Sequence, residues 1–331
     1  MIITELYDGQ GLGNQLWVYA AARSIAEQLD VPFVLLGAER FKGKSFLNID
    51  SEVEISALEA LDVAKGAHWK SFYEALYYDR DLDYISSGFD SRVLAMSGAN
   101  KLDGLYQSEK YFFGNLERPK RYFFLDDAWK TKNPVPDDTC IINLRGGEYK
   151  RHKNFILPES YWKKAIENMK NIAGVRKFLV VTDDVRYARV MFPGFDVLEG
   201  EIGDCYASLY NAKFLILSNS SFAYFPVKTG GNSRVVIAPK YWARYANLME
   251  RWASPANLYE SWLWQASDGK LFTWEECLPE CEATEAEYEI KYFVRTTLEQ
   301  VKKPGVRQFV PEAIRRKLKR GLSLIFPRHF G

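Results

Sequence analysis

Short apolar runs alternate with helix-like stretches from residue 139 to residue 238, and this alternation restricts the possible folds more than any other feature. The runs have the length and β-branched content of buried strands, and they cover 139–144, 177–182, 196–198, 214–217 and 234–238. The stretches expected as helices between them are 158–172, 185–191, 203–212 and a further one after 221. Strands that alternate with helices form a parallel sheet covered on both faces. The sequence therefore predicts a Rossmann-like domain in this half of the chain.

The amino-terminal half opens with a second strand–helix–strand unit. We expect a strand at 2–7, a glycine loop at 8–13, an amphipathic helix at 14–29 and a strand at 32–36. The loop resembles a dinucleotide fingerprint, but Asn14 stands where the third glycine would be, and no acid follows the second strand until Glu39. A glycine loop at a helix amino terminus still suits an anion or a hydroxyl-rich ligand, because its backbone N–H groups are free.

Composition and charge exclude several classes of protein. The 331 residues are 47% hydrophobic and 15% aromatic, which suffices for a globular core, and a net charge of +1 gives no reason to expect nucleic acid as a partner. We expect neither a signal peptide nor a membrane-spanning helix, because no stretch is apolar for long enough. The four cysteines have no zinc-site spacing, and Cys277 and Cys281, the pair close enough to form a disulfide or share a metal, have no histidine nearby. Reduced thiols in a cytoplasmic protein are the expectation.

Polar residues follow three of the predicted strands in the second half. Arg145 and Glu148 follow the first of them, Asp183 and Asp184 the next, and the Asn-Ser-Ser run 219–221 another. Ligands of open α/β sheets bind outside the carboxyl ends of the strands, where a guanidinium and a helix amino terminus suit a phosphate. Each group also has a simpler interpretation, because Arg145 can form a structural ion pair and Asp, Ser and Asn are common helix caps. Their recurrence at successive strand ends favours one shared site.

Several motifs carry a resemblance to a known family. They are 11–15 (Gly-Leu-Gly-Asn-Gln), 105–112 (Leu-Tyr-Gln-Ser-Glu-Lys-Tyr-Phe), 143–149 (Asn-Leu-Arg-Gly-Gly-Glu-Tyr), 182–184 (Thr-Asp-Asp), 219–222 (Asn-Ser-Ser-Phe) and 237–240 (Ile-Ala-Pro-Lys). In order and approximate spacing they resemble the bacterial α-1,2-fucosyltransferases of glycosyltransferase family 11. The resemblance covers roughly residues 1–242 and implies a GT-B fold, GDP-fucose as donor, no metal or other cofactor, and inversion at the sugar carbon.

The resemblance assigns roles to three regions and to particular residues. Residues 1–136 become an acceptor-side α/β domain, 137–250 a nucleotide-sugar-binding Rossmann-like domain across a cleft from it, and 251–331 a helical extension. Arg145 would stabilise the leaving diphosphate and Glu148 would act as the base. The donor-binding candidates are Gly11, Gly13, Asn14, Gln15, Asn143, Gly147, Tyr149, Asp183, Asp184, Asn219, Ser220, Ser221 and Phe222. Gln107 and Glu109 are expected on the acceptor side.

Departures from the family pattern keep three functional readings open. The family's central motif reads His-x-Arg-Arg-Gly-Asp-Tyr, whereas 143–149 keeps only the first arginine, a glycine and the tyrosine. The first reading is a glycosyltransferase, most specifically a fucosyltransferase of cell-surface polysaccharide synthesis. The second is a metal-dependent transferase or hydrolase that uses Asp79, Asp81 and Asp83. The third is a non-catalytic descendant that binds a nucleotide sugar or a glycan.

The carboxyl-terminal region shows two further patterns. Tryptophans at 252, 262, 264 and 274 indicate a well-packed helical extension, in which core packing is favoured over a sugar platform. Within 311–326, apolar residues at helical spacing lie among arginines and lysines, as in basic helices at membrane surfaces. We therefore expect peripheral contact with anionic lipid on the inner face of the membrane, while a docking helix or a disordered tail stays open.

Overall fold

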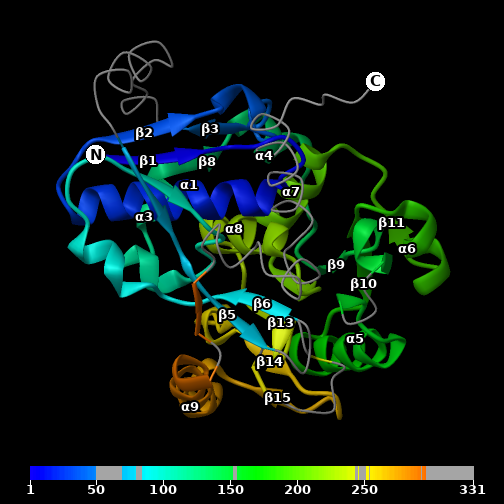
Figure 1. The fold of residues 1–331 in the computed structure, drawn as a ribbon. Coiled ribbons are helices and arrows are strands. Elements are labelled where there is room, and N and C mark those ends of the chain that lie inside the picture. Colours follow the sequence, from blue (N-terminus) through cyan, green and yellow to red (C-terminus); the bar gives the residue numbers. More distant parts are fainter. Residues whose placement is uncertain are drawn as a thin grey trace, which may run out of the picture.

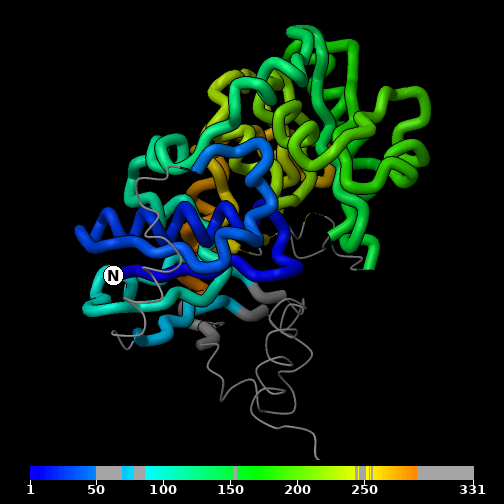
Figure 2. The backbone as a smooth tube through the Cα atoms, turned by 90° about the horizontal axis from the view of Figure 1, so that it is seen from above, coloured from blue at the N-terminus to red at the C-terminus, as the bar shows by residue number. Residues whose placement is uncertain are grey.

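The structure is a computed structural model that describes residues 1–49, 69–79, 84–151, 155–242, 245, 251–252, 254–291 and 293–295 (Figure 1). Two parallel sheets, one in each half of the chain, organise these residues. Seen from above in Figure 2, the two halves lie on different sides of the molecule. The expected α/β class with two Rossmann-like parts is confirmed.

The first sheet has four parallel strands in the order β2-β1-β7-β4. Its strands are β1 (Ile2–Glu5), β2 (Phe33–Leu36), β4 (Lys70–Tyr73) and β7 (Asn100–Asp103). The chain moves from β1 outward to β2 on one side and builds β4 and β7 on the other. The order therefore reverses between β1 and β7, and this reversal is the topological switch point of the sheet.

The second sheet has seven strands in the order β11-β10-β9-β12-β13-β14-β15, and only β15 runs antiparallel to its neighbour. Its strands are β9 (Thr139–Leu144), β10 (Lys177–Thr182), β11 (Asp196–Val197), β12 (Phe214–Leu217), β13 (Val235–Pro239), β14 (Leu263–Gln265) and β15 (Leu271–Phe272). The first six follow the order of a dinucleotide-binding Rossmann sheet, with the switch point between β9 and β12.

Helix α1 (Leu12–Gln28) connects the two halves. Every residue from Leu12 to Ala26 is buried except Asn14. The helix packs on β1 and β2 with one side and on α8 (Ser221–Gly230), which follows β12, with another. A helix covered on several sides must be apolar around most of its circumference, which is why the expected amphipathic pattern is replaced by burial on all sides.

Aromatic rings extend one core through both halves. Trp17 of α1 lies 4.3 Å from Tyr224 and 4.9 Å from Phe225 of α8, measured between ring centroids. Trp252, Trp262 and Trp264 are buried in the same cluster of apolar side chains. The preference for core packing of these tryptophans is therefore confirmed, and a sugar platform built on them is not available.

The other helices cover the sheets or connect them. They are η1 (Ala38–Arg40), η3 (Ser91–Ala95), η4 (Glu109–Phe112), α3 (Arg118–Tyr122), α4 (Asp127–Lys132), η5 (Gly147–Arg151), α5 (Glu159–Ala173), α6 (Val185–Met191), α7 (Ile202–Asn211), η8 (Pro255–Asn257) and α9 (Trp274–Lys291). Two small antiparallel sheets contain β3 (Leu47–Ile49) with β8 (Phe123–Leu125), and β5 (Ala75–Asp79) with β6 (Tyr84–Ser87) and β16 (Phe293–Arg295).

The carboxyl-terminal region adds more than the helix that was expected. Helix α9 carries Cys277 and Cys281, which are buried free thiols, as are Cys140 and Cys205. The same region also adds β14 and β15 to the second sheet and β16 to a small sheet, and none of these strands was predicted. Residues 311–326 lie outside the described residues.

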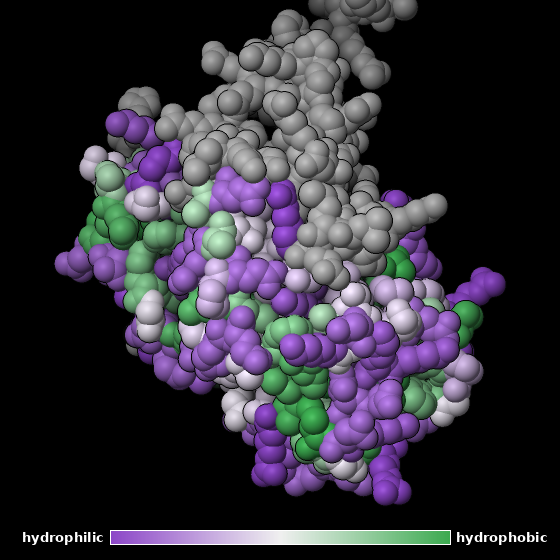
Figure 3. All heavy atoms as spheres, turned by 90° about the horizontal axis from the view of Figure 1, so that it is seen from below, coloured by the Kyte–Doolittle hydropathy of each residue, from purple (hydrophilic) through white to green (hydrophobic). Residues whose placement is uncertain are grey.

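Large apolar side chains are exposed at a few places on the described surface. The face in Figure 3 is mostly hydrophilic, with an elongated band and some smaller groups of hydrophobic residues. The large apolar side chains exposed at the described surface are Trp69, Leu94, Phe124, Ile172, Val190 and Ile202, which come from six different segments. Isolated exposed apolar residues are normal for a globular protein. No helix among the described residues is long and apolar enough to span a bilayer.

Candidate functional site

The two switch points of the sheets meet at the starts of α1 and α8. At the first sheet, the first turn of α1, the helix after β1, supplies Asn14, and the loop after β7 supplies Gln107. At the second sheet, the segment after β12 supplies Ser221, and the segment after β9 supplies Arg145. Because ligands of open α/β sheets bind at such reversals, two of them side by side mark the candidate site, here called the junction.

Asn14 connects the two sides of the junction. Its Oδ1 accepts a hydrogen bond from Gln107 Nε2 at 2.9 Å and another from Ser221 Oγ at 2.8 Å. Gly13 makes the close approach possible, because a Cβ there would lie 2.5 Å from the backbone of Ser221 and Phe222. The start of α1 and the Asn-Ser-Ser run, more than 200 residues apart in the chain, are therefore in contact.

The junction places two helix amino termini next to each other. Neither α1 nor α8 has an acidic residue in its first turn, and the α1 N-cap, Gly11, has no side chain to cap the helix. Ser220 caps α8 weakly by accepting from the N–H of Phe222 at 3.4 Å. Free N–H groups and the positive ends of two helix dipoles favour a bound anion, and two like ends this close are stabilised by one.

Arg145 lies beside the junction and is partly engaged. Its Nη1 is 2.7 Å from Asp183 Oδ2, its Nη2 is 3.3 Å from Glu148 Oε1, and its guanidinium lies 5.3 Å from the Tyr149 ring centroid. Its Nε is buried and has no hydrogen-bond partner among the described residues. Asp183 also accepts from the N–H of Gly146 at 2.8 Å, and Gly147, at φ +35°, leaves room for it. The ion pair expected under the simpler interpretation is therefore present, and it orients the guanidinium.

A buried acceptor completes this side of the junction. Asn219 is 5% exposed, and its Oδ1 has no hydrogen-bond partner among the described residues. Its backbone oxygen accepts from the Tyr149 hydroxyl at 3.3 Å. Burial raises the pKa of Tyr149, so the phenol stays a neutral donor. An unsatisfied buried amide oxygen costs stability by itself and fits a position that a ligand donor occupies.

Four of the residues predicted to bind the sugar donor have partners within the fold. Gln15 is fully buried and uses both ends of its amide on the backbone of Arg40 and Lys42. Asn143 accepts from Ser218 within the second sheet at 3.1 Å. Asp184 caps α6, and an ion pair with Lys150 lowers its pKa. Phe222 packs against the ring of Tyr206. The fold itself therefore engages these four side chains, which local sequence cannot show, and their role in donor binding stays a prediction.

The acceptor-side candidates separate. Gln107 lies in the junction through its bond to Asn14. Glu109 instead accepts from the Tyr224 hydroxyl at 2.8 Å and lies 3.1 Å from Lys228 Nζ, so it joins η4 to α8. Glu148 is exposed, and its recorded partner is Arg145.

Sequence reasoning missed a buried carboxylate behind the junction. Glu74 has no exposed surface and follows β4 directly. Its partners come from three other segments, which include Ser87 and Tyr111. The available signal was an acid within the otherwise apolar run 72–77 (Phe-Tyr-Glu-Ala-Leu-Tyr), a position where a charge needs buried partners.

The alternative metal site, at Asp79, Asp81 and Asp83, lies mostly outside the described residues. Asp79 ends β5, while Asp81 and Asp83 lie outside the described residues, as do all three histidines. In the part of the chain that the structure covers, no group of three or more His, Cys, Asp and Glu side chains is arranged to hold a metal ion.

Comparisons with known proteins give distant structural similarities. No family model matches the chain, and no curated protein matches it. The fucosyltransferase NodZ from Bradyrhizobium is 12% identical at a TM-score of 0.43, over 72% of this chain and 94% of that one. POFUT1 in complex with GDP-fucose is 10% identical at a TM-score of 0.38, over 72% of this chain and 96% of that one. A family 9 glycosyl transferase from Veillonella parvula DSM 2008 is 11% identical at a TM-score of 0.40, over 86% of this chain and 97% of that one. Identities and TM-scores this low do not support a function, so the function has to be argued from this chain's own residues.

Proposed function

We propose that this protein is an inverting, metal-independent glycosyltransferase that transfers fucose from GDP-fucose to a hydroxyl group of a glycan. The observation that carries the proposal is the meeting of two acid-free helix amino termini at two adjacent switch points, with Arg145 beside them. The motif resemblance to α-1,2-fucosyltransferases supports the donor, the linkage and a place in cell-surface polysaccharide synthesis.

The chemistry of transfer fits this arrangement. As the bond between the sugar carbon and the diphosphate breaks, negative charge grows on the departing phosphate oxygens. Helix N–H groups and a guanidinium that are already in place stabilise that charge without reorganisation. The Nε of Arg145 has no hydrogen-bond partner in the part of the chain that the structure describes, and Asp183 holds the guanidinium plane in position. These donor groups support the proposal that a diphosphate leaves at the junction.

The acceptor side requires a base. The acceptor hydroxyl attacks the sugar carbon and passes its proton to a carboxylate, which ends the step protonated while the nucleoside diphosphate leaves. We assign this role to Glu148, which is exposed and lies 3.3 Å from Arg145.

Nucleotide binding tests the proposal directly. Addition of GDP at about 100 times its Kd should stabilise the protein by roughly 2.7 kcal/mol, and a chelator should leave this shift unchanged. UDP and ADP serve as matched ligands with the same diphosphate. A shift that needs manganese would favour the metal-dependent reading, and binding of GDP-fucose without turnover on any glycan would favour the non-catalytic one.

We also propose that the segment 311–326 contacts anionic membrane, on the strength of its basic, helically spaced sequence. Removal of residues 311–331 should abolish co-sedimentation with vesicles that contain phosphatidylserine and leave turnover in solution intact. A full-length protein that ignores such vesicles at low salt would refute this.

A further inference from the structure

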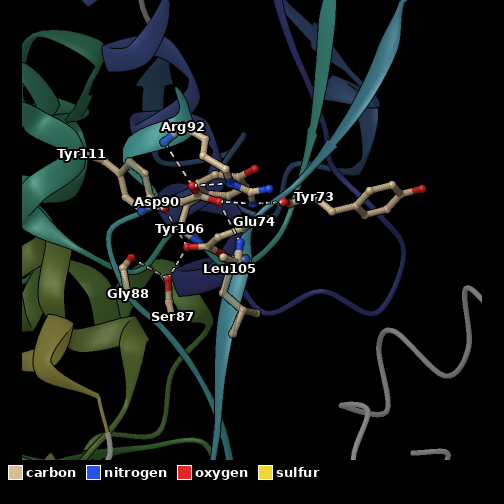
Figure 4. A network of polar contacts seen from close by, with 10 residues as sticks. Tyr73, Glu74, Ser87, Gly88, Asp90, Arg92, Leu105, Tyr106 and Tyr111 are labelled. Atoms are coloured by element: carbon tan, nitrogen blue, oxygen red, sulfur yellow. Dashed lines mark hydrogen bonds and ion pairs between the residues drawn. The ribbon is translucent and has the colours of Figure 1, made fainter. Parts of the chain in front are cut away.

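Glu74 is the centre of a buried polar network (Figure 4). Its Oε2 accepts from the backbone N–H groups of Leu105 at 2.7 Å and Tyr106 at 2.8 Å. Its Oε1 accepts from the Tyr111 hydroxyl at 3.0 Å and from the Ser87 hydroxyl. The carboxylate therefore joins the ends of β4 and β6, the loop after β7 and the helix η4.

The network continues to the junction. The Ser87 oxygen, which donates its proton to Glu74, accepts from the backbone N–H of Gln107 at 3.1 Å. The side chain of Gln107 donates to Asn14, and Asn14 accepts from Ser221 at the start of α8. An unbroken series of hydrogen bonds thus leads from the buried carboxylate to both helix amino termini.

All four partners of Glu74 act as donors, so the site is built for a carboxylate. Two of them are backbone N–H groups, which cannot reverse, and the Tyr111 oxygen already accepts from the N–H of Asp90 at 3.0 Å. A proton on Glu74 would face donors and would force the Ser87 hydroxyl to turn, for example toward the Gly88 oxygen at 3.4 Å. The proton on Glu74 would then point at the Ser87 oxygen and compete with the N–H of Gln107 for it.

Other ionisable groups surround Glu74. They are Asp90 and Arg92 of η3 and its cap, Asp103 of β7, Tyr106 of the following loop, and Tyr111 of η4. Asp90 and Arg92 pair with each other, and burial raises the pKa of Tyr106 and of Tyr111. Burial also raises the pKa of Glu74 to about 7, against the hydrogen bonds that lower it.

We propose that Glu74 is a positioning residue of the enzyme: as a carboxylate it fixes the loop 104–107 and, through the Ser87 hydroxyl, holds Gln107 against Asn14 at the junction. Its part in turnover rests on the proposed function. Because the ionised form positions the junction, sugar transfer should weaken as the pH falls below about 7. Stability should change the opposite way, because the folded protein binds the proton more tightly than the unfolded chain.

The test compares wild type with Glu74→Gln, which keeps the shape and loses the charge, and with Ser87→Ala, which keeps the carboxylate and removes the hydroxyl that links it to Gln107. Asp204→Asn is the matched control, since Asp204 is also a buried carboxylate that accepts from a backbone N–H, that of Glu201, and its ion-pair partner is Lys132. Hydrogen–deuterium exchange is followed at residues 105–107 and 221–224, and unfolding and kcat are measured from about pH 5.5 to about pH 8.5.

We expect faster exchange in both segments for Glu74→Gln and Ser87→Ala, and a roughly ten- to hundredfold lower kcat for Glu74→Gln at about pH 8. Glu74→Gln should also lose the acid limb of the kcat profile and the fall in stability between about pH 5 and about pH 8. Unchanged exchange at 221–224 in both variants, or an acid limb that survives Glu74→Gln, overturns the inference. Exchange measures positioning even if no sugar is transferred, whereas absence of turnover in wild type would count against the proposed function alone.

Discussion

The two sides of the junction are built by different means. On the second sheet, Arg145, Tyr149, Asn219 and Ser221 follow their strands within a few residues, and the strands shape the site directly. On the first sheet, Gln107 is held by Glu74 and Ser87, which come from segments about 20 to 30 residues earlier. One side depends on local sequence, and the other depends on a buried charge that tertiary contacts surround.

The two sides of the junction should therefore respond differently to substitution. A substitution on the second side should remove an interaction with the ligand and leave the fold intact. A substitution on the first side should loosen the positions of other residues, because a buried carboxylate without its donors, or donors without their carboxylate, is costly. The predictions below separate these two consequences.

The largest effect is expected for Arg145→Lys. Lysine keeps a positive charge near Asp183 but lacks the planar pair of donors, so kcat should fall by roughly 100- to 1,000-fold with a smaller change in nucleotide affinity. Steady-state kinetics with GDP-fucose and a glycan acceptor measure this. The matched control is Arg189→Lys, because Arg189 makes an exposed ion pair with Glu199 outside the junction.

Chemical unfolding must first show that Arg145→Lys is as stable as wild type. If a folded variant transfers sugar at the wild-type rate, Arg145 only forms the ion pair with Asp183 and does not stabilise the leaving diphosphate. Glu148→Gln, measured beside it, should lower kcat and spare GDP affinity. Full turnover of that variant at every pH would mean that another carboxylate is the base.

A smaller effect, on stability, is expected for Gly13→Ala. The new Cβ would lie 2.5 Å from the backbone of Ser221 and Phe222, and backbone cannot step aside as a flexible side chain can. We expect a loss of about 2 kcal/mol in the free energy of unfolding, together with weaker GDP binding as the two helix starts separate. Denaturant titration and calorimetry give the two values.

Gly11→Ala is the control for this prediction, since a Cβ at Gly11 has nothing within 4 Å and its φ of −69° suits any residue. It should cost at most about 1 kcal/mol, through the poorer N-cap. Equal losses for the two variants would mean that the close approach of α1 and α8 does not hold the junction together.

Much of the second half could be predicted because its signals are local. The strands at 177–182 and 214–217 and the helix at 185–191 were predicted with the bounds that the structure shows. A buried parallel strand needs an apolar run and a helix needs its own period, and both are visible within a few residues. The same local signals placed Arg145 and Ser221 at carboxyl strand ends, and the topology of the sheet then placed both at one switch point.

The sequence by itself determined the α/β class, the ends of the strands and the polar residues that stand there. Only the tertiary structure decided which of these side chains the fold engages, as with Gln15 and Asp184. It also decided which keep an atom with no partner among the described residues, as Arg145 and Asn219 do. It alone brought Glu74 to its four donors and Asn14 to Ser221. The physical reason is that hydrogen-bond satisfaction and desolvation depend on neighbours in space, and these neighbours are here up to 207 residues apart in the chain.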